Sequence, residues 1–197
     1  MALQEPESEQ SNPQLSAAMR RTRTAILDAA LAVLPVNPKA SLSDIAEKAD
    51  VGRSTLHRHF NDRTDLVRAL ALYVRDLSNV AIDRAEPEVG TPLAAIRRLV
   101  DGQFDLGPIL VFLHEDPLVR TDPELHEQFG VGEDKLIMAI TRAADPADPT
   151  PTAWRLRVFW ELVRLGSDFT ANGAARHEAI DAIMYTLTHG MAAGESR

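Results

Sequence analysis

The sequence predicts an all-α protein of about nine helices, with an N-terminal three-helix domain built around a helix-turn-helix and a C-terminal helical domain. Apolar residues recur along the chain at the three- and four-residue spacing of a helix. Clusters of proline and glycine interrupt this spacing, as they do at helix ends, and no stretch shows the alternation typical of a strand. There is no internal repeat.

Composition narrows the class of protein. A length of 197 residues and a hydrophobic content of 45% suit a globular protein of one or two domains. The chain has no cysteine, which excludes disulfides and thiolate metal sites and favours a reducing compartment. No apolar run approaches the ~20 residues that span a membrane, and the acidic, polar N-terminus is unlike a secretory signal. We therefore expect a cytoplasmic protein with no membrane partner.

Charge is unevenly distributed along the chain, whose formal net charge is −8. Residues 15–75 hold ten Lys/Arg against six Asp/Glu, a net +4, whereas residues 76–197 hold eleven against twenty, a net −9. The first 14 residues add three acids. A mildly basic N-terminal part on an acidic body is the distribution expected when the N-terminal domain meets a polyanion.

The first elements are a tail and a helix. Residues 1–15 are rich in Glu, Gln, Ser and Pro and predict a disordered tail. A helix is expected from Ala18 to Leu34, ended by the prolines that follow. Its first turns carry Arg20, Arg21 and Arg23, the wrong sign of charge for the helix dipole. These arginines either face an anion or form a solvated charge run.

Residues 41–60, SLSDIAEKADVGRSTLHRHF, predict two short helices joined by a tight turn. Ser41 or Ser43 can cap the first helix, with Asp44 or Glu47 reaching back to the cap. The Asp-Val-Gly sequence at residues 50–52 then breaks the apolar spacing. The spacing resumes with Leu56 and Phe60, which lie about one helical turn from each other. This is the pattern of a helix-turn-helix, whose second helix enters the DNA major groove.

The second helix of this motif has an acid-free polar face. From Val51 through Asn61 there is no carboxylate, whereas a solvated surface helix ordinarily mixes both signs of charge. We expect base readout and phosphate contacts from different parts of the domain. The predicted base-reading residues are Arg53, Ser54, Thr55 and Arg58. The predicted phosphate-contacting residues are Thr24, Ser43, His57, His59 and Arg63.

Residues 20–70 resemble the DNA-binding domain of the tetracycline-repressor (TetR) family of regulators. The resemblance rests on RRTRTAILDAALAVL, on SLSDIAEKADVGRSTLHRHF and on the following NDRTDLVRAL. Three positions depart from the family pattern: Asp50 replaces a usual Gly, His57 a usual Tyr and Arg63 a usual Lys. Aspartate tolerates a left-handed backbone, so we expect the turn to persist. The boundaries that follow are 16–62 for the DNA-binding domain and 63–197 for an effector-binding and dimerisation domain.

The rest of the chain also predicts helices. A long helix is expected from residue 62 to Ala85, ended by a proline- and glycine-containing cluster at residues 86–91. Further helices are expected over 92–104, 109–113, 123–144, 152–172 and 176–190. Pro117 should stop the 109–113 helix, and Gly130 and Gly132 should weaken the middle of the 123–144 helix.

Catalytic and metal chemistry has no support in the sequence. His57 and His59 point about 200° apart on a helix, so they cannot share one ion. The run from His114 to Asp116 fits a capped, solvated helix end. Phosphate-binding glycine loops and nucleophile motifs are absent. We therefore expect no enzyme activity, no cofactor and no metal.

The C-terminal domain offers candidates for two further roles. Aromatic residues at helical spacing are ordinarily core, but in a sensing domain some could line an apolar ligand pocket. The pocket candidates are Phe104, Phe112, His114, Phe129, Trp154 and Arg164. The final helix carries an apolar stripe and the helix before it is apolar over more than one face, which predicts a four-helix dimer bundle rather than a monomer core alone. The predicted interface residues are Phe159, Leu162, Ile180, Ile183, Met184 and Leu187.

The TetR-family resemblance implies a homodimeric transcription factor, usually a repressor, that leaves a palindromic operator when a small molecule binds its body. Double-stranded DNA, an unknown small-molecule effector and a second copy of the chain are the implied partners. One alternative is a DNA-binding regulator without an effector. Another is a helical interaction module or enzyme in which the helix-turn-helix is purely structural.

Overall fold

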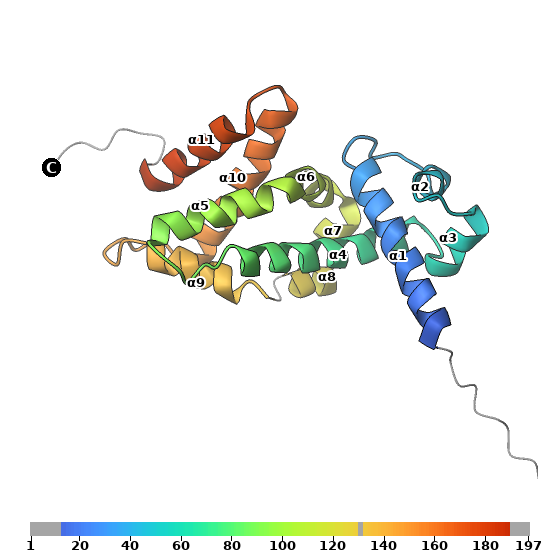
Figure 1. Ribbon diagram of the computed structural model, residues 1–197. Coiled ribbons are helices and arrows are strands. Elements are labelled where there is room, and N and C mark those ends of the chain that lie inside the picture. Colours follow the sequence, from blue (N-terminus) through green and yellow to red (C-terminus); the bar gives the residue numbers. More distant parts are fainter. Residues whose placement is uncertain (1–12, 130–131, 190–197) are drawn as a thin grey trace, which may run out of the picture.

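The structure, a computed structural model, describes residues 13–129 and 132–189, and these residues are helical throughout, with short connections. Four helices begin the chain: α1 (Pro13–Val33), α2 (Leu42–Lys48), α3 (Arg53–His59) and the long α4 (Arg63–Arg84). The first three form a head at one end of the molecule, and α4 runs from this head into the body (Figure 1). The predicted fold class is confirmed.

The body comprises the remaining helices. They are α5 (Pro92–Gln103), the 3-10 helix η1 (Phe104–Leu106), α6 (Gly107–Glu115), α7 (Pro117–Thr121), α8 (Pro123–Phe129), α9 (Asp134–Ala143), α10 (Thr152–Ala171) and α11 (Arg176–His189). Helix α11 packs on α10 and α5 and lies at the end of the molecule opposite α3 (Figure 1). Within the described residues, no helix combines the length and the apolar character that a membrane span needs.

Three element boundaries differ from the sequence prediction. Helix α1 begins at Pro13, because proline suits the first turn of a helix, so residues 13–15 are helical; residues 1–12 of the expected tail lie outside the described residues. Pro117 opens α7 instead of only stopping α6, since the Asp116 carboxylate caps α7 by accepting from the Leu118 amide. The expected 123–144 helix is two helices, α8 and α9. The described part of the chain therefore has eleven α-helices rather than about nine.

Two hydrophobic clusters lie along α4. The first contains the head core, from Ile26 to Val74, together with buried residues of η1, α6 and α8 such as Ile109 and Leu125. The second begins at Ile82 and contains buried residues of α5, η1, α9, α10 and α11. Helices α6 to α8 thus share a core with the head, although the sequence boundary at residues 62/63 assigns them to the other domain.

Polar contacts join the head to α4 and α4 to the neighbouring body helices. The Tyr73 hydroxyl on α4 donates to Asp28 Oδ1 on α1 at 2.7 Å. Arg68 forms an ion pair with Asp122 at the junction of α7 and α8. Helix α4 therefore contacts both α1 and the α7–α8 junction, and links the two.

Candidate functional site

The helix-turn-helix is built by a capping box and a left-handed turn. Ser41 caps α2: its Oγ accepts from the Asp44 amide at 3.2 Å, and Asp44 Oδ2 accepts from the Ser41 amide at 2.7 Å. Hydrogen bonding of the Asp44 carboxylate with the Ser41 backbone amide, and then with the Ser41 side chain, lowers the pKa of Asp44. Asp50 adopts φ 54°, as the resemblance led us to expect, and its carboxylate-bearing side chain replaces the usual glycine. Leu56 and Phe60, both at most 2% exposed, seat α3 on the head core.

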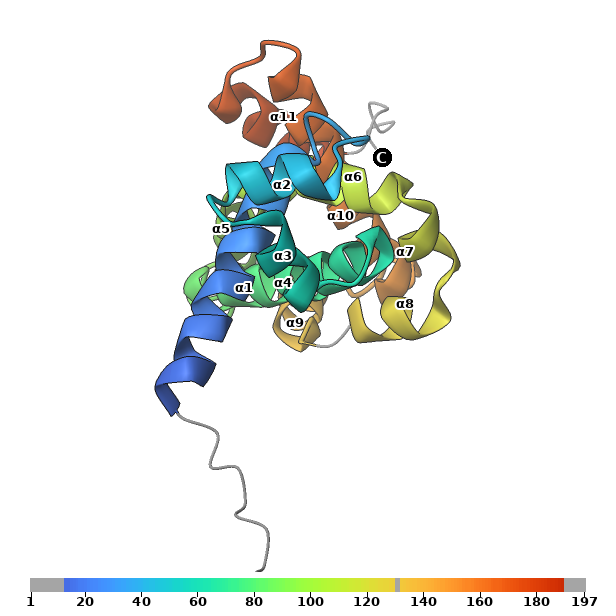
Figure 2. The same cartoon turned by 90° about the vertical axis from the view of Figure 1, so that its right-hand side faces the viewer.

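The opposite face of α3 is turned to solvent. Arg53, Ser54 and Arg58 are exposed, and Thr55 is half-buried. Arg58 Nη2 donates to Thr55 Oγ1 at 3.0 Å, one helical turn away. Figure 2 shows the head from outside, with α1, α2 and α3 toward the viewer and the body behind. The structure therefore places all four predicted base-reading residues on α3 at the free end of the molecule.

Arg23 of α1 has a role that the sequence did not indicate. Its Nη1 donates to the His59 carbonyl at 3.4 Å, and its guanidinium lies 4.5 Å from the centre of the Phe60 ring. A cation at the C-terminus of α3 interacts favourably with the last carbonyls of that helix. Arg23 thus helps to hold α3 on α1. Nothing in the local sequence could have revealed a contact between residues 36 positions apart.

The predicted phosphate contacts fall into two groups. Thr24 and His57 are exposed, and Ser43 and His59 are half-buried. Burial, with the nearby charges of Arg23 and Arg58, lowers the pKa of His59 and so favours its neutral imidazole. A neutral imidazole can still donate one hydrogen bond to a phosphate but brings no charge to it.

Arg63, the fifth predicted phosphate contact, donates hydrogen bonds within the chain. Its guanidinium faces the connection between α1 and α2, where Nη1 donates to the Ala40 carbonyl at 2.8 Å and Nη2 to the Pro38 carbonyl at 2.6 Å. Both terminal nitrogens are therefore engaged within the chain. The sequence placed Arg63 at the start of α4 but could not show that the folded-back connection offers two carbonyls to it.

Among residues 13–129 and 132–189, the buried polar side chains are Ser78, Gln103 and Ser167, which we call the polar boundary. On α4, Ser78 lies between Val74 of the first cluster and Ile82 of the second. Gln103 is completely buried: its Nε2 donates to the Ser78 carbonyl at 3.0 Å, while its Oε1 has no partner among the described residues. An unsatisfied buried carbonyl costs about 1–3 kcal/mol. The sequence signal was available, because Gln103 falls four residues after buried Leu99, on the apolar face of α5.

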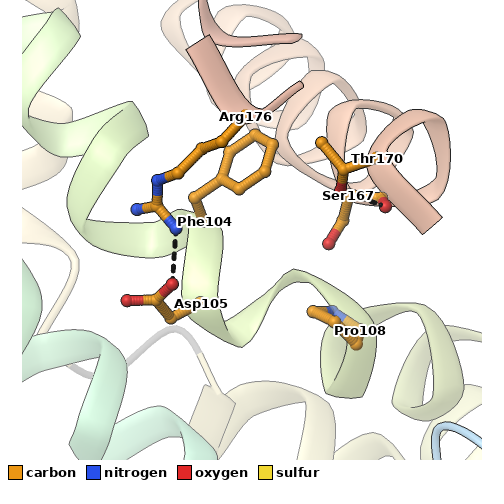
Figure 3. A pocket seen from close by; sticks show the side chains of 6 residues that line it. All are labelled: Phe104, Asp105, Pro108, Ser167, Thr170 and Arg176. Carbon is orange, nitrogen blue, oxygen red and sulfur yellow. Dashed lines mark hydrogen bonds and ion pairs between the residues drawn. The ribbon is translucent and has the colours of Figure 1, made fainter. Parts of the chain in front are cut away.

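Close packing surrounds this boundary. A Cβ built on Gly107 would lie 2.0 Å from Ser167 Oγ, and one on Gly166 would lie 2.6 Å from Ile183 Cδ1. Helix α6 therefore approaches α10 closely at Gly107, where the small Ser167 side chain packs against the glycine backbone. Beside this contact an open groove of about 270 Å³ is lined by Phe104, Asp105, Pro108, Ser167, Thr170 and Arg176. In Figure 3 the Arg176 side chain lies along Phe104 and is paired with Asp105.

The predicted effector-pocket residues do not converge on one cavity. Phe104 lines the groove, but Phe112 is buried in the other cluster. Trp154 is 62% exposed, at the start of α10 and on the side away from the core. Arg164 donates to Glu161 on its own helix at 2.9 Å. The side chains of His114 and Phe129 lie outside what the structure describes.

The predicted dimer residues also divide. Phe159, Ile180 and Ile183 are 1%, 5% and 3% exposed, because they fill the second cluster of their own chain, so they leave a partner almost no surface. Leu162, Met184 and Leu187 are half-buried. The outward face of α10 and α11 instead exposes large side chains that the prediction did not include. These are Trp154, Leu165, Phe169 and Tyr185, each more than half exposed.

The chain is similar in sequence to known bacterial regulatory proteins. The model of a family described as "Bacterial regulatory proteins, tetR family" matches residues 26–70. The HTH-type transcriptional repressor LfrR of Mycolicibacterium smegmatis is 48% identical over 176 residues, which cover 89% of this chain and 93% of LfrR.

Solved structures agree with the sequence match. The crystal structure of LfrR from Mycobacterium smegmatis in complex with proflavine superposes with a TM-score of 0.83 at 48% identity, covering 89% of this chain and 98% of that one. A second LfrR crystal structure, described without a ligand, gives a TM-score of 0.63 at 44% identity and covers 85% and 98%. The described helices therefore have the arrangement of a ligand-binding repressor.

Proposed function

Because the chain belongs to the tetR family of bacterial regulatory proteins, we propose that it represses transcription as a homodimer and leaves its operator when an aromatic small molecule enters the body. The observation that carries the proposal is the solvent-facing, acid-free side of α3 at the free end of the head. An isolated basic helix would bind any polyanion. A helix seated by Leu56 and Phe60 and held at its C-terminus by Arg23 presents its side chains in a fixed geometry.

We assign sequence readout to α3. Arg53 and Arg58 have the side chain best suited to bidentate contact with guanine, worth ~1–3 kcal/mol of discrimination per contact. Ser54 and Thr55 lie between them on the same helix. Phosphate contact falls to the flanking exposed residues Thr24 and His57, with Ser43 and a neutral His59 as donors. Arg63 serves this surface indirectly, by holding the α1–α2 connection.

A second copy of the chain is the proposed partner at the other end. The outward face of α10 and α11 carries Leu165, Phe169 and Tyr185, with half-buried Leu162 and Leu187 beside them. Exposed apolar side chains in one contiguous region of two packed helices support a self-complementary four-helix interface. Function supports it too, since two recognition helices about 34 Å apart read a palindrome in successive major grooves.

The effector site is proposed at the polar boundary, between α4, α5 and α10. Three observations support this position: a buried polar pair, a groove that reaches Phe104 and Ser167, and a close contact between Gly107 of α6 and Ser167 of α10. LfrR has been solved with proflavine, and that structure is the better match to this chain of the two LfrR structures. We infer that an aromatic ligand of the same class enters here.

The proposed release mechanism follows from the two clusters. A ligand between them displaces α6 from α4 or α10, and α6 to α8 share their core with the head. Displacement passes to α4 through that core and through the Arg68–Asp122 ion pair, and from α4 to α1 through the Tyr73–Asp28 hydrogen bond. The ligand thus favours a body conformation in which the two heads of a dimer no longer match the half-site spacing.

Fluorescence anisotropy with labelled upstream DNA tests the proposal. We expect salt-sensitive, sequence-specific binding, lost on Arg58→Ala but kept on Arg84→Ala, a matched control at the exposed far end of α4. Proflavine should release the operator. Because flat dyes also bind DNA, the dye is titrated against the same duplex without protein. Equal affinity for operator and scrambled DNA would refute specific repression, and retention of operator at saturating dye would refute the effector role.

A further inference from the structure

The polar boundary contains an acceptor whose orientation is fixed. Gln103 Nε2 donates to the Ser78 carbonyl, so a flipped amide would set two acceptors, Oε1 and that carbonyl, against each other. The unsatisfied atom is therefore Oε1, a carbonyl oxygen that can only accept. Gln103 is 0% exposed, and its nearest chain neighbours on the buried face, Leu99, Val100 and Phe104, are apolar.

We propose that Gln103 Oε1 is the specificity-determining acceptor of the effector site and selects aromatic ligands that carry an amino N–H donor. The inference rests on the proposed effector function and adds the chemical group that the ligand must present. An apolar ring alone satisfies the neighbouring side chains but leaves Oε1 unpaired. A ring with an amino group pairs it, and the site then distinguishes the two by the cost of a buried, unpaired carbonyl.

Gln103 lies where the two hydrophobic clusters meet, so ligand binding there is coupled to the conformation of the body. Gln103 ends α5, and the next three residues are η1, in which Phe104 belongs to the second cluster and Leu106 to the first. Ser78, which anchors the Gln103 amide, lies between the two clusters on α4. A ligand held by Oε1 therefore lies where the clusters meet, and its bulk acts on α4 and α6 rather than on one helix within a cluster.

The ligand chemistry is limited by what the interior lacks. Among the described residues the buried polar side chains are Ser78, Gln103 and Ser167, and none of them is charged. A charged group placed there would remain unpaired, at a large desolvation cost. The part of the ligand that reaches Gln103 is therefore a neutral amino group on an aromatic ring, as on an aminoacridine.

The test is a thermodynamic cycle in which the Gln103 acceptor and the N–H donors of the ligand are removed separately and together. Gln103→Met keeps the length of the side chain but removes the acceptor. Proflavine is compared with acridine orange, which is also a cation at pH 8 but whose dimethylamino groups have no N–H donor. Binding is measured by dye fluorescence with the full-length, DNA-free protein at pH 8. We expect wild type to prefer proflavine over acridine orange by about tenfold or more, and Gln103→Met to lose this preference. Gln128→Leu, on α8, is the matched control and should keep the preference.

Each outcome shows whether Gln103 Oε1 recognises the amino group of the ligand or has another role. If Gln103→Met keeps the preference for proflavine, the inference is overturned, while operator release by proflavine leaves the proposed function standing. If Gln103→Met changes only thermal stability, Oε1 is satisfied by a trapped water and not by a ligand, which also overturns the inference. Gln103→Leu provides the same comparison should the Met variant fail to fold. Absence of any preference in wild type overturns the inference directly.

Discussion

Substitution of Arg63 tests the head sharply, because a structural role and a phosphate contact predict opposite effects on thermal stability and on the salt dependence of DNA binding. In the structure its guanidinium donates to the carbonyls of Pro38 and Ala40 at 2.6 and 2.8 Å. Hydrogen bonds that involve a charged group contribute ~1.5–3 kcal/mol each, and the bond to Pro38 is exposed, so water replaces part of it. Arg63→Ala should therefore lower the free energy of unfolding by about 2–3 kcal/mol. For a chain of this size that corresponds to a fall in Tm of roughly 4–10 °C.

The DNA-binding consequence distinguishes the roles. If Arg63 only positions the α1–α2 connection, the variant loses operator affinity but keeps the dependence of binding on salt concentration. If Arg63 neutralises a phosphate, the slope of log K against log salt falls by about 0.9. Arg63→Lys should recover part of the stability, because an ammonium reaches one carbonyl but lacks the planar fork that bridges two.

Thermal unfolding followed by circular dichroism, at one protein concentration, measures the first effect, and anisotropy at four salt concentrations measures the second. Arg84→Ala, an exposed arginine at the other end of α4, controls for removal of one positive charge. An Arg63→Ala protein with unchanged Tm and a flattened salt slope would refute the structural role assigned here and restore the phosphate contact.

Three further expectations concern the dimer, the interior and pH. The double variant Leu165→Glu with Phe169→Glu should give folded monomers by light scattering and abolish operator binding. The control Val89→Glu replaces an apolar residue that is 52% exposed between α4 and α5, and it should leave a dimer. A double variant that remains dimeric would place the interface elsewhere. Gly107→Ala should destabilise the body because its Cβ would meet Ser167 Cβ at 2.3 Å, so Ser167→Gly should rescue it and Ser167→Ala should not; equal rescue by both would contradict this packing. Burial, with the hydrogen bond to Asp28, raises the pKa of Tyr73 to about 12, so its contribution to stability is complete below the ordinary tyrosine pKa and is lost as pH rises through 12. Tyr73→Phe should remove this alkaline loss in pH-dependent unfolding, and an identical profile for the variant would show that Tyr73 does not titrate as described.

Local signals in the sequence were sufficient for the helix-turn-helix. Capping of α2 depends on Ser41 and Asp44, three residues apart, and the turn depends on the tolerance of Asp50 for a left-handed backbone. The spacing of Leu56 and Phe60 determined which side of α3 is buried, and hence that Arg53 and Arg58 face solvent. Each of these interactions lies within a few residues of chain, so the pattern and the structure agree.

Tertiary structure decided everything that depends on a partner distant in sequence. Arg63 is exposed to phosphate or bound to carbonyls according to where residues 38–40 fold, some 25 positions away. Ile183 and Leu165 are both apolar residues on the last two helices, yet one is 3% and the other 54% exposed. The packing of α10 on α6 and α9, and of α11 on α5 and α10, selects which face is internal. Gln103 is visible in the sequence as a polar residue on an apolar face. That its amide is fixed by Ser78 with its oxygen unpaired is a property of two helices meeting, and helical periodicity carries no information about the neighbour that a face will meet.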